Sequence, residues 1–280
     1  MARAEAAATA PAGGGSLKLR ILSAVVLAPL ALAAVWFGSP WLPLVTAAAG
    51  AGMAWEWARL CGGGRLGAGG VVLIAAVLAA IAEAGFGHTG LALAWAFSGA
   101  LAVYAAARLQ RQGEPGWLAL GTLWVALPCV LLLWLAGREA AGRGVLLWLF
   151  AVVWATDIGA YAFGRAVGGP LLAPRWSPRK TWAGLVGGAC CAALAGGGVA
   201  AALGIPSIFT VVLLSAGLAI VEQFGDLAES VAKRRFGVKD SSGLIPGHGG
   251  LLDRLDGLLA VVPAVALLTL IGGGSVPAWR

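Results

Sequence analysis

Nine long apolar runs, separated by short segments rich in glycine, proline and charge, constrain the fold of this chain more than any other feature. They lie near residues 21–37, 42–58, 70–86, 90–107, 117–136, 145–164, 182–203, 207–224 and 257–273. Crossing a bilayer takes roughly 20 apolar residues in a helix, and only helices and closed barrels satisfy their backbone there. Because the runs are continuous and do not alternate, the sequence predicts an all-α polytopic membrane protein with about nine transmembrane helices.

Composition agrees with this class of protein. Hydrophobic residues make up 60% of the chain and charged residues 11%, whereas about a quarter of the residues in soluble domains are charged. Residues 1–16 are small and lack an apolar face, so we expect a disordered tail. Residues 17–280 are predicted to form a single transmembrane domain, with 17–140 mainly scaffold and 141–280 the catalytic half.

The basic residues predict an orientation. If the N-terminus is cytoplasmic and the runs alternate, only Arg138, Arg143 and Arg280 of the 19 Lys and Arg residues fall outside the cytoplasmic segments. Positive charge is enriched on the cytoplasmic side of membrane proteins and meets anionic headgroups there. We therefore expect a lipid bilayer and no nucleic acid as partner, an inner (plasma) membrane location, and polar clusters that face the cytoplasm. A signal peptide cleaved after the first run would leave eight spans and is the alternative.

The first polar cluster lies inside the sixth run. Asp157, Tyr161 and Gly164 recur at helical spacing and share one face. A carboxylate within a span is costly, so Asp157 should face a partner, a cation or a water-filled cavity. A purely structural pairing with a basic residue remains open.

The second cluster, RWSPRKTWAG, precedes the seventh run. Pro178 suits the first turn of a helix, with Ser177 as its cap. Together with Lys180 and Thr181, such a helix end predicts a phosphate site. A simple topology signal from flanking basic residues is the alternative.

The third cluster joins the end of the eighth run to the start of the ninth. If the helix continues, Asp226, Ser230 and Lys233 share a face, and Asp253 and Asp256 share a face of the next helix. Carboxylates that converge near Asp226 would form an oxygen-rich site for Mg²⁺. Ion pairing of these acids with nearby lysines and arginines is the alternative.

At residues 230–256, SVAKRRFGVKDSSGLIPGHGGLLDRLD resembles the signature of the phosphatidate cytidylyltransferases, also called CDP-diacylglycerol synthases. The similarity continues upstream in SPRKTW at 177–182 and DIGAYAFGR at 157–165. One departure is Ala183, which stands where a glutamate commonly follows the upstream motif. This departure weakens the assignment of residues 177–184 to the site. It also leaves a catalytically inactive relative as an alternative.

The resemblance implies a reaction between CTP and phosphatidic acid that gives CDP-diacylglycerol and pyrophosphate. It also implies a requirement for Mg²⁺, with a second cation left open, and a homodimer. The residues expected to take part in catalysis are Asp226, Lys239, His248, Asp253 and Asp256, of which Asp226, Asp253 and Asp256 would hold the metal. Those expected to bind substrate are Ser177, Lys180, Thr181, Ser230, Lys233, Arg234 and Arg254.

An ion-coupled transporter is the alternative from a different class, because buried carboxylates also mark ion pathways. Such transporters show inverted repeats with broken helices, and the sequence shows no such repetition. The roles of Glu56 and Asp157, structural or supporting the site, stay open.

Overall fold

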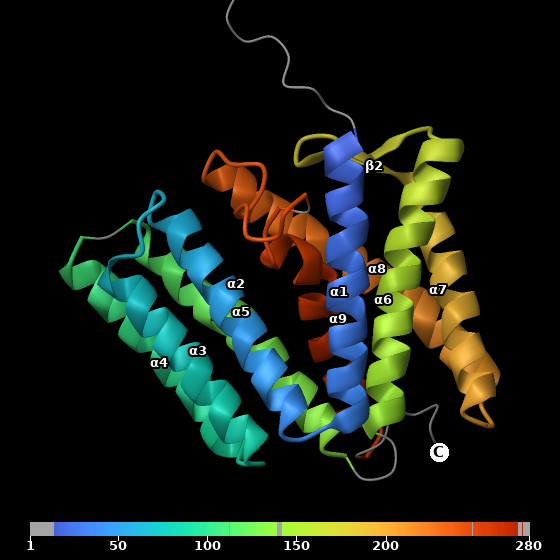
Figure 1. Ribbon diagram of the computed structural model, residues 1–280, viewed down its shortest axis with the longest axis horizontal. Helices are drawn as coiled ribbons and strands as arrows, with labels where there is room; N and C mark the ends of the chain where they lie inside the picture. The colour runs from blue at the N-terminus through green and yellow to red at the C-terminus, as the bar shows by residue number, and fades with distance from the viewer. Residues whose placement is uncertain (1–13, 112, 139–141, 248, 274–275, 277–280) are drawn as a thin grey trace, which may run out of the picture.

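The computed structural model describes residues 14–111, 113–138, 142–247, 249–273 and 276 (Figure 1). Within these residues the chain forms nine α-helices and one β-hairpin. The helices are α1 (Gly14–Phe37), α2 (Trp41–Cys61), α3 (Gly67–Gly85), α4 (Thr89–Leu109), α5 (Pro115–Ala136), α6 (Gly142–Ala166), α7 (Trp182–Ala202), α8 (Ile208–Arg235) and α9 (Leu252–Ile271). The hairpin consists of β1 (Leu171–Ala173) and β2 (Ser177–Thr181) and lies between α6 and α7.

Each predicted apolar run corresponds to one of these helices, so the prediction of an all-α polytopic membrane protein is confirmed. Among the described residues, the helices from α3 to α9 are long and apolar enough to cross a membrane. In α1 the apolar stretch is the shorter segment Val25–Phe37, and the count of nine spans stays a prediction. Of the predicted tail, residues 1–13 lie outside the described residues, and Gly14–Ser16 begin α1.

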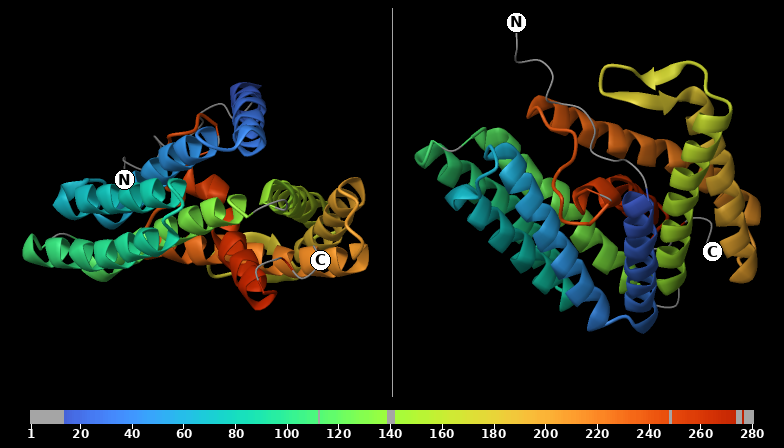
Figure 2. Two further views of the ribbon diagram at one scale, coloured as in Figure 1. Left: turned by 90° about the horizontal axis from the view of Figure 1, so that it is seen from below. Right: turned by 45° about the horizontal axis from the view of Figure 1, so that its top comes forward.

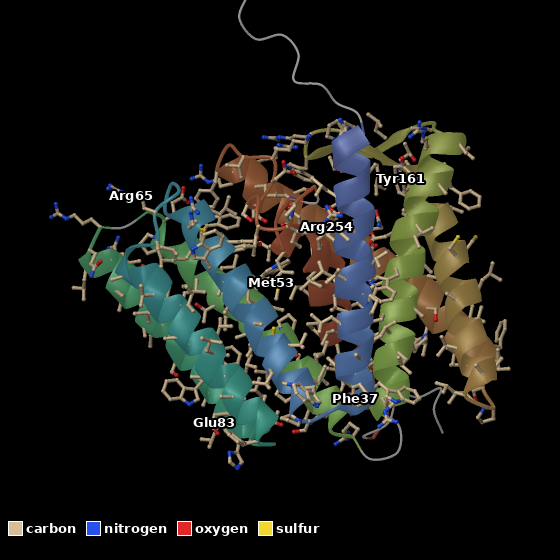
Figure 3. The ribbon with its side chains drawn as sticks, viewed as in Figure 1. Phe37, Met53, Arg65, Glu83, Tyr161 and Arg254 are labelled. Atoms are coloured by element: carbon tan, nitrogen blue, oxygen red, sulfur yellow. The ribbon has the colours of Figure 1, made fainter. Side chains whose placement is uncertain are left out.

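Successive helices run in alternate directions (Figure 1). One end of the molecule, called here the upper end, carries residues 62–66, the hairpin and residues 236–247, while residues 38–40, 86–88 and 203–207 lie at the opposite, lower end. Figure 3 shows Arg65 and Arg254 at the upper end and Phe37 and Glu83 at the lower end. The connections therefore alternate between the two ends as the sequence predicted.

The helices pack as two groups joined by α9. Helices α2 to α5 pack against one another, and α6 to α8 form the second group. Helix α9 contacts α8 and α6 on one side and α5 and α2 on the other, while α1 lies at the edge against α2 and α6 (Figures 1 and 2). The residues at the start of α9 are thus placed where both halves of the chain meet.

Small residues set the close approach of α6 and α7. A Cβ atom on Gly159 would lie 2.7 Å from the Cys191 sulfur, and one on Gly187 would overlap the Phe163 side chain. Membrane helices without a hydrophobic driving force between them associate through such close packing of small residues. This packing brings the hairpin that links α6 and α7 to the upper end, where it projects beyond the helices (Figure 2).

The prediction that Pro178 opens a helix capped by Ser177 is wrong. Residues Ser177–Thr181 form β2, in which Ser177 pairs with Ala173 and Thr181 pairs with Leu171. Proline has a fixed φ and no N–H, properties that suit an edge strand as well as a first helical turn. Helix α7 begins at Trp182, and its cap is Thr181, whose Oγ1 accepts a hydrogen bond from the Gly184 N–H at 3.0 Å.

This geometry predicts unequal effects of two hydroxyl deletions. Thr181→Ala should lower the free energy of unfolding by about 1 kcal/mol, because one N–H of the first turn of α7 loses its acceptor. Thr181→Ser keeps the acceptor and should restore most of the stability, and Ser177→Ala should leave it unchanged. Thermal unfolding of the detergent-purified variants measures the difference, and a larger loss for Ser177→Ala would contradict the assignment of the cap.

Candidate active site

The polar residues singled out in the sequence gather at the upper end, where α8 ends, α9 begins and the hairpin approaches them. Helix α8 continues past its apolar part to Arg235, as predicted. Its acids Glu222, Asp226 and Glu229 follow one another at intervals of four and three residues and therefore share a face with Lys233. This face is turned toward α9.

Two glycines bring α8 and α9 together at this point. A Cβ on Gly225 would lie 2.8 Å from the backbone oxygen of Asp256, and one on Gly257 would lie 2.6 Å from Cγ of Glu222. The close approach places the carboxyl group of Asp256 within electrostatic range of Asp226. Two of the three predicted metal ligands therefore interact electrostatically across the crossing.

Further carboxyl groups complete an acid cluster around this crossing. Glu222, which is 1% exposed, interacts with Asp157 of α6, and Asp256 interacts with Glu229, which is fully buried. The amide of Gln223 donates a hydrogen bond to Glu222 at 2.7 Å. Carboxylates this close cannot all stay charged unless a proton or a cation lies between them.

The hairpin supplies one such cation. Lys180 Nζ on β2 lies 2.6 Å from Oδ2 of Asp226, and the Ser230 hydroxyl donates to Oδ1 of the same carboxylate at 3.4 Å. The predicted residues Lys180, Asp226 and Ser230 are thus brought together. Thr181 is buried as the cap of α7, and Ser177 is partly exposed on β2.

Asp253, the first acid of α9, is surrounded by donors. Lys233 Nζ lies 2.6 Å from Oδ1, while Oδ2 accepts from the Gly250 N–H at 2.8 Å and from both the N–H and the hydroxyl of Ser241, at 2.9 and 3.0 Å. Lys233 also pairs with Glu229 at 3.4 Å. Across the described part of the chain, no group of three or more His, Cys, Asp or Glu side chains is arranged as a metal site. The metal-binding roles of Asp226, Asp253 and Asp256 therefore stay predictions.

The other predicted cations lie at the surface of the upper end. Lys239, Arg234 and Arg254 are exposed. Arg234 donates to the backbone oxygen of Val238 at 3.1 Å, and the charge of Arg254 acts on Asp157. The predicted site residue His248 lies outside the described residues.

The structure also assigns contacts to acids whose part in the site was not predicted. Glu222 and Glu229 belong to the acid cluster, and their spacing from Asp226 was a readable signal for it. Glu56 of α2 is fully buried and reaches the loop before α9. Its position inside an apolar run indicated that it has a polar partner, but the sequence does not identify that partner.

The fold and these clusters define a multi-span membrane protein with a site of mixed charge at one end of the bundle. Residues 18–271 match the model of the Cytidylyltransferase family, and the chain belongs to that family. A protein from Brucella suis biovar 1 (strain 1330), named phosphatidate cytidylyltransferase, is 42% identical over 268 residues that cover 92% of this chain and 93% of the relative. A protein of the same name from Pseudomonas aeruginosa is 35% identical over 271 residues, covering 93% of this chain and 100% of the relative. The resemblance inferred from the motifs is confirmed.

The crossing of α8 and α9 gives a test of the site. Gly225→Ala should force the two helices apart, because the new methyl group would meet the backbone of Asp256 and the side chain of Ala260. We expect cytidylyltransferase activity to fall about tenfold or more, since small misplacements of reacting groups have effects of this size. Activity per folded molecule is the measurement.

The matched control is Gly217→Ala in the same helix, where an added Cβ meets nothing within 4 Å. This variant should keep native activity. Equal activities of the two alanine variants would show that the close approach at Gly225 does not matter to the site.

Proposed function

We propose that this protein transfers a cytidylyl group from CTP to phosphatidic acid, which gives CDP-diacylglycerol and pyrophosphate for phospholipid biosynthesis. The observation that carries the proposal is the convergence of two motifs around Asp226. Ser230 and Asp256 of the 230–256 motif and Lys180 of the hairpin meet there, in a chain whose relatives over nearly their full length are named phosphatidate cytidylyltransferases.

The reaction joins two anions. An oxygen of the phosphatidate phosphate attacks the α-phosphorus of CTP, the new P–O bond forms, and the bond to the β-phosphate breaks with release of pyrophosphate. The attacking oxygen is already anionic and needs little help from a general base. Charge neutralisation and alignment are what a site must supply, and the basic side chains at the upper end suit this task. They are Lys180, Lys233, Arg234, Lys239 and Arg254.

We further propose that Mg²⁺ takes part. Both carboxylate oxygens of Glu229 are buried, Lys233 Nζ lies 3.4 Å from Oε2, and the carboxyl of Asp256 is beside them. This is an oxygen-rich setting of the kind that a hard divalent cation prefers. Asp226 and Asp256 would hold the metal together with Asp253. When bound, the metal would offset the charge of the phosphates; a second cation and a homodimer remain part of the proposal from the family resemblance.

For the orientation we propose nine spans, a cytoplasmic N-terminus and a site that faces the cytoplasm from the inner (plasma) membrane. The support is the charge distribution, because among the described Lys and Arg residues only Arg138 and Arg143 belong to the lower end. CTP would then reach the site from the water, and phosphatidate would enter from the inner leaflet.

Conversion of phosphatidic acid by the detergent-purified protein tests the proposed reaction. CDP-diacylglycerol should form only when CTP and Mg²⁺ are both present. Asp253→Asn should insert and purify normally yet lose activity by roughly 100-fold or more at every Mg²⁺ concentration, because an amide replaces a charge that the site needs.

The control for this substitution is Glu83→Gln, the same change of acid to amide at the lower end, where Glu83 pairs with His88 at 2.9 Å. It should be fully active. Near-native activity of Asp253→Asn would remove Asp253 from the site. A folded native protein that forms no product would instead indicate an inactive relative.

Reporter fusions test the orientation separately. Alkaline phosphatase fused after Gly64, at the upper end, should be inactive because it stays in the reducing cytoplasm, whereas a fusion after Gly87, at the lower end, should be active. The reverse pattern would overturn the proposed orientation without affecting the proposed reaction.

A further inference from the structure

A buried carboxylate from the first half of the chain holds the loop that leads into α9. Glu56 lies on α2 and is 0% exposed. Its Oε1 accepts hydrogen bonds from the Leu251 N–H at 2.8 Å and from the Ser242 hydroxyl at 2.6 Å. Its Oε2 accepts from the Leu252 N–H at 2.7 Å and lies 3.2 Å from the Ser241 hydroxyl, whose single proton it shares with Asp253.

These contacts complete the first turn of α9. The residue at the N-cap position, Leu251, has no side chain that could accept a hydrogen bond from the helix. The first N–H groups of a helix have no partner within it and form its positive end. Glu56 takes the N–H groups of Leu251 and Leu252, while Asp253 takes that of Gly250. Glu56 thus caps the helix from a distant part of the chain, and Asp253 holds the backbone just before it.

Ser241 connects the two carboxylates. Its hydroxyl lies 3.2 Å from Oε2 of Glu56 and 3.0 Å from Oδ2 of Asp253. The loop is packed tightly around this contact, because a Cβ on Gly250 would overlap the Ser241 hydroxyl and lie 2.8 Å from Oε1 of Glu56. If Glu56 moved, the side chain of Ser241 would therefore move with it and displace Asp253.

We propose that Glu56 is a positioning residue of the site, which fixes the backbone at residues 241–242 and 250–252 and, through Ser241, the carboxylate of Asp253. A buried carboxylate is stable only where donors surround it. The donors around Glu56 are two hydroxyls and two backbone N–H groups of the loop and of α9, so its burial favours the one loop conformation that presents them together. The kinetic part of this inference rests on the proposed function.

The test compares Glu56→Gln with the native protein in two measurements. The glutamine NH₂ group would face an N–H donor, so backbone amides at 250–252 should exchange with deuterium faster. Turnover of CTP and phosphatidate per folded molecule should fall about tenfold or more as Asp253 moves. Both changes together support the proposal.

Val77→Ala serves as the control for general destabilisation, because Val77 is fully buried in α3 and has no part in the loop. It should lower thermal stability yet keep native turnover and native exchange at 250–252. If Glu56→Gln behaves in the same way, Glu56 only stabilises the fold and the proposal is overturned.

Ser242→Ala keeps the test decisive if Glu56→Gln does not fold. It removes one donor and leaves the carboxylate in place, so we expect faster exchange at 250–252 and a several-fold loss of turnover; native values for both would overturn the proposal. The exchange measurement needs no catalysis. A native protein without activity would therefore count against the proposed function, and the exchange data alone would then decide the role of Glu56.

Discussion

Burying a carboxylate in an apolar bundle costs free energy, and this cost determines the contacts at the upper end of the molecule. Each acid there must meet a cation or a set of donors, because an unpaired charge in such surroundings is strongly disfavoured. Asp226 meets Lys180 of the hairpin, Asp253 meets Lys233, and Glu56 meets four neutral donors. Each of these pairings joins different elements, so the charges hold the hairpin, α2, α8 and the loop before α9 in fixed relation.

Glu229 and Asp256 differ from these acids because their carboxyl groups interact with each other; Asp256 also accepts a hydrogen bond from the Gly257 N–H at 2.8 Å. They approach each other, and Lys233 lies 3.4 Å from Glu229 while making its shorter contact with Asp253. Acidic groups therefore outnumber the cations at the crossing of α8 and α9, so a proton or an added cation must offset their charge. The carboxyl groups at this crossing would attract an added cation. The exposed side chains of Arg234, Lys239 and Arg254 can contact phosphates. Binding of an anionic nucleotide together with a cation would use both properties.

Much of the fold could be predicted from the sequence because hydropathy is a local signal. The continuation of α8 to Arg235 was also predictable, since helical spacing aligned Asp226, Ser230 and Lys233. The hairpin was not, because Pro178 suits two conformations and the choice depends on pairing with Leu171–Ala173. The contacts of Glu56 were beyond prediction for a different reason. Its partners lie as many as 196 residues away in the chain, and no local pattern specifies a contact of that separation. The division into a scaffold half and a catalytic half stays a prediction, and the contacts of Glu56 link the first half to the loop before α9.

The surroundings of the acid cluster suit a reaction between a lipid and a nucleotide. On α8, Phe224 is 67% exposed although Glu222, two residues earlier, is buried, and on α6 the apolar Ile158 is 69% exposed beside Asp157, which is also exposed but interacts with Glu222. Within one helical turn, each helix thus presents an apolar surface outward and a carboxyl group toward the cluster. Acyl chains could remain against the outer surface while a headgroup reaches the charged residues at the helix ends. Because α8 continues beyond its apolar part, the same site also meets water, from which a triphosphate must come. A site buried deeper in the bundle would exclude the nucleotide, and one carried on a separate soluble domain would require the lipid to leave the bilayer.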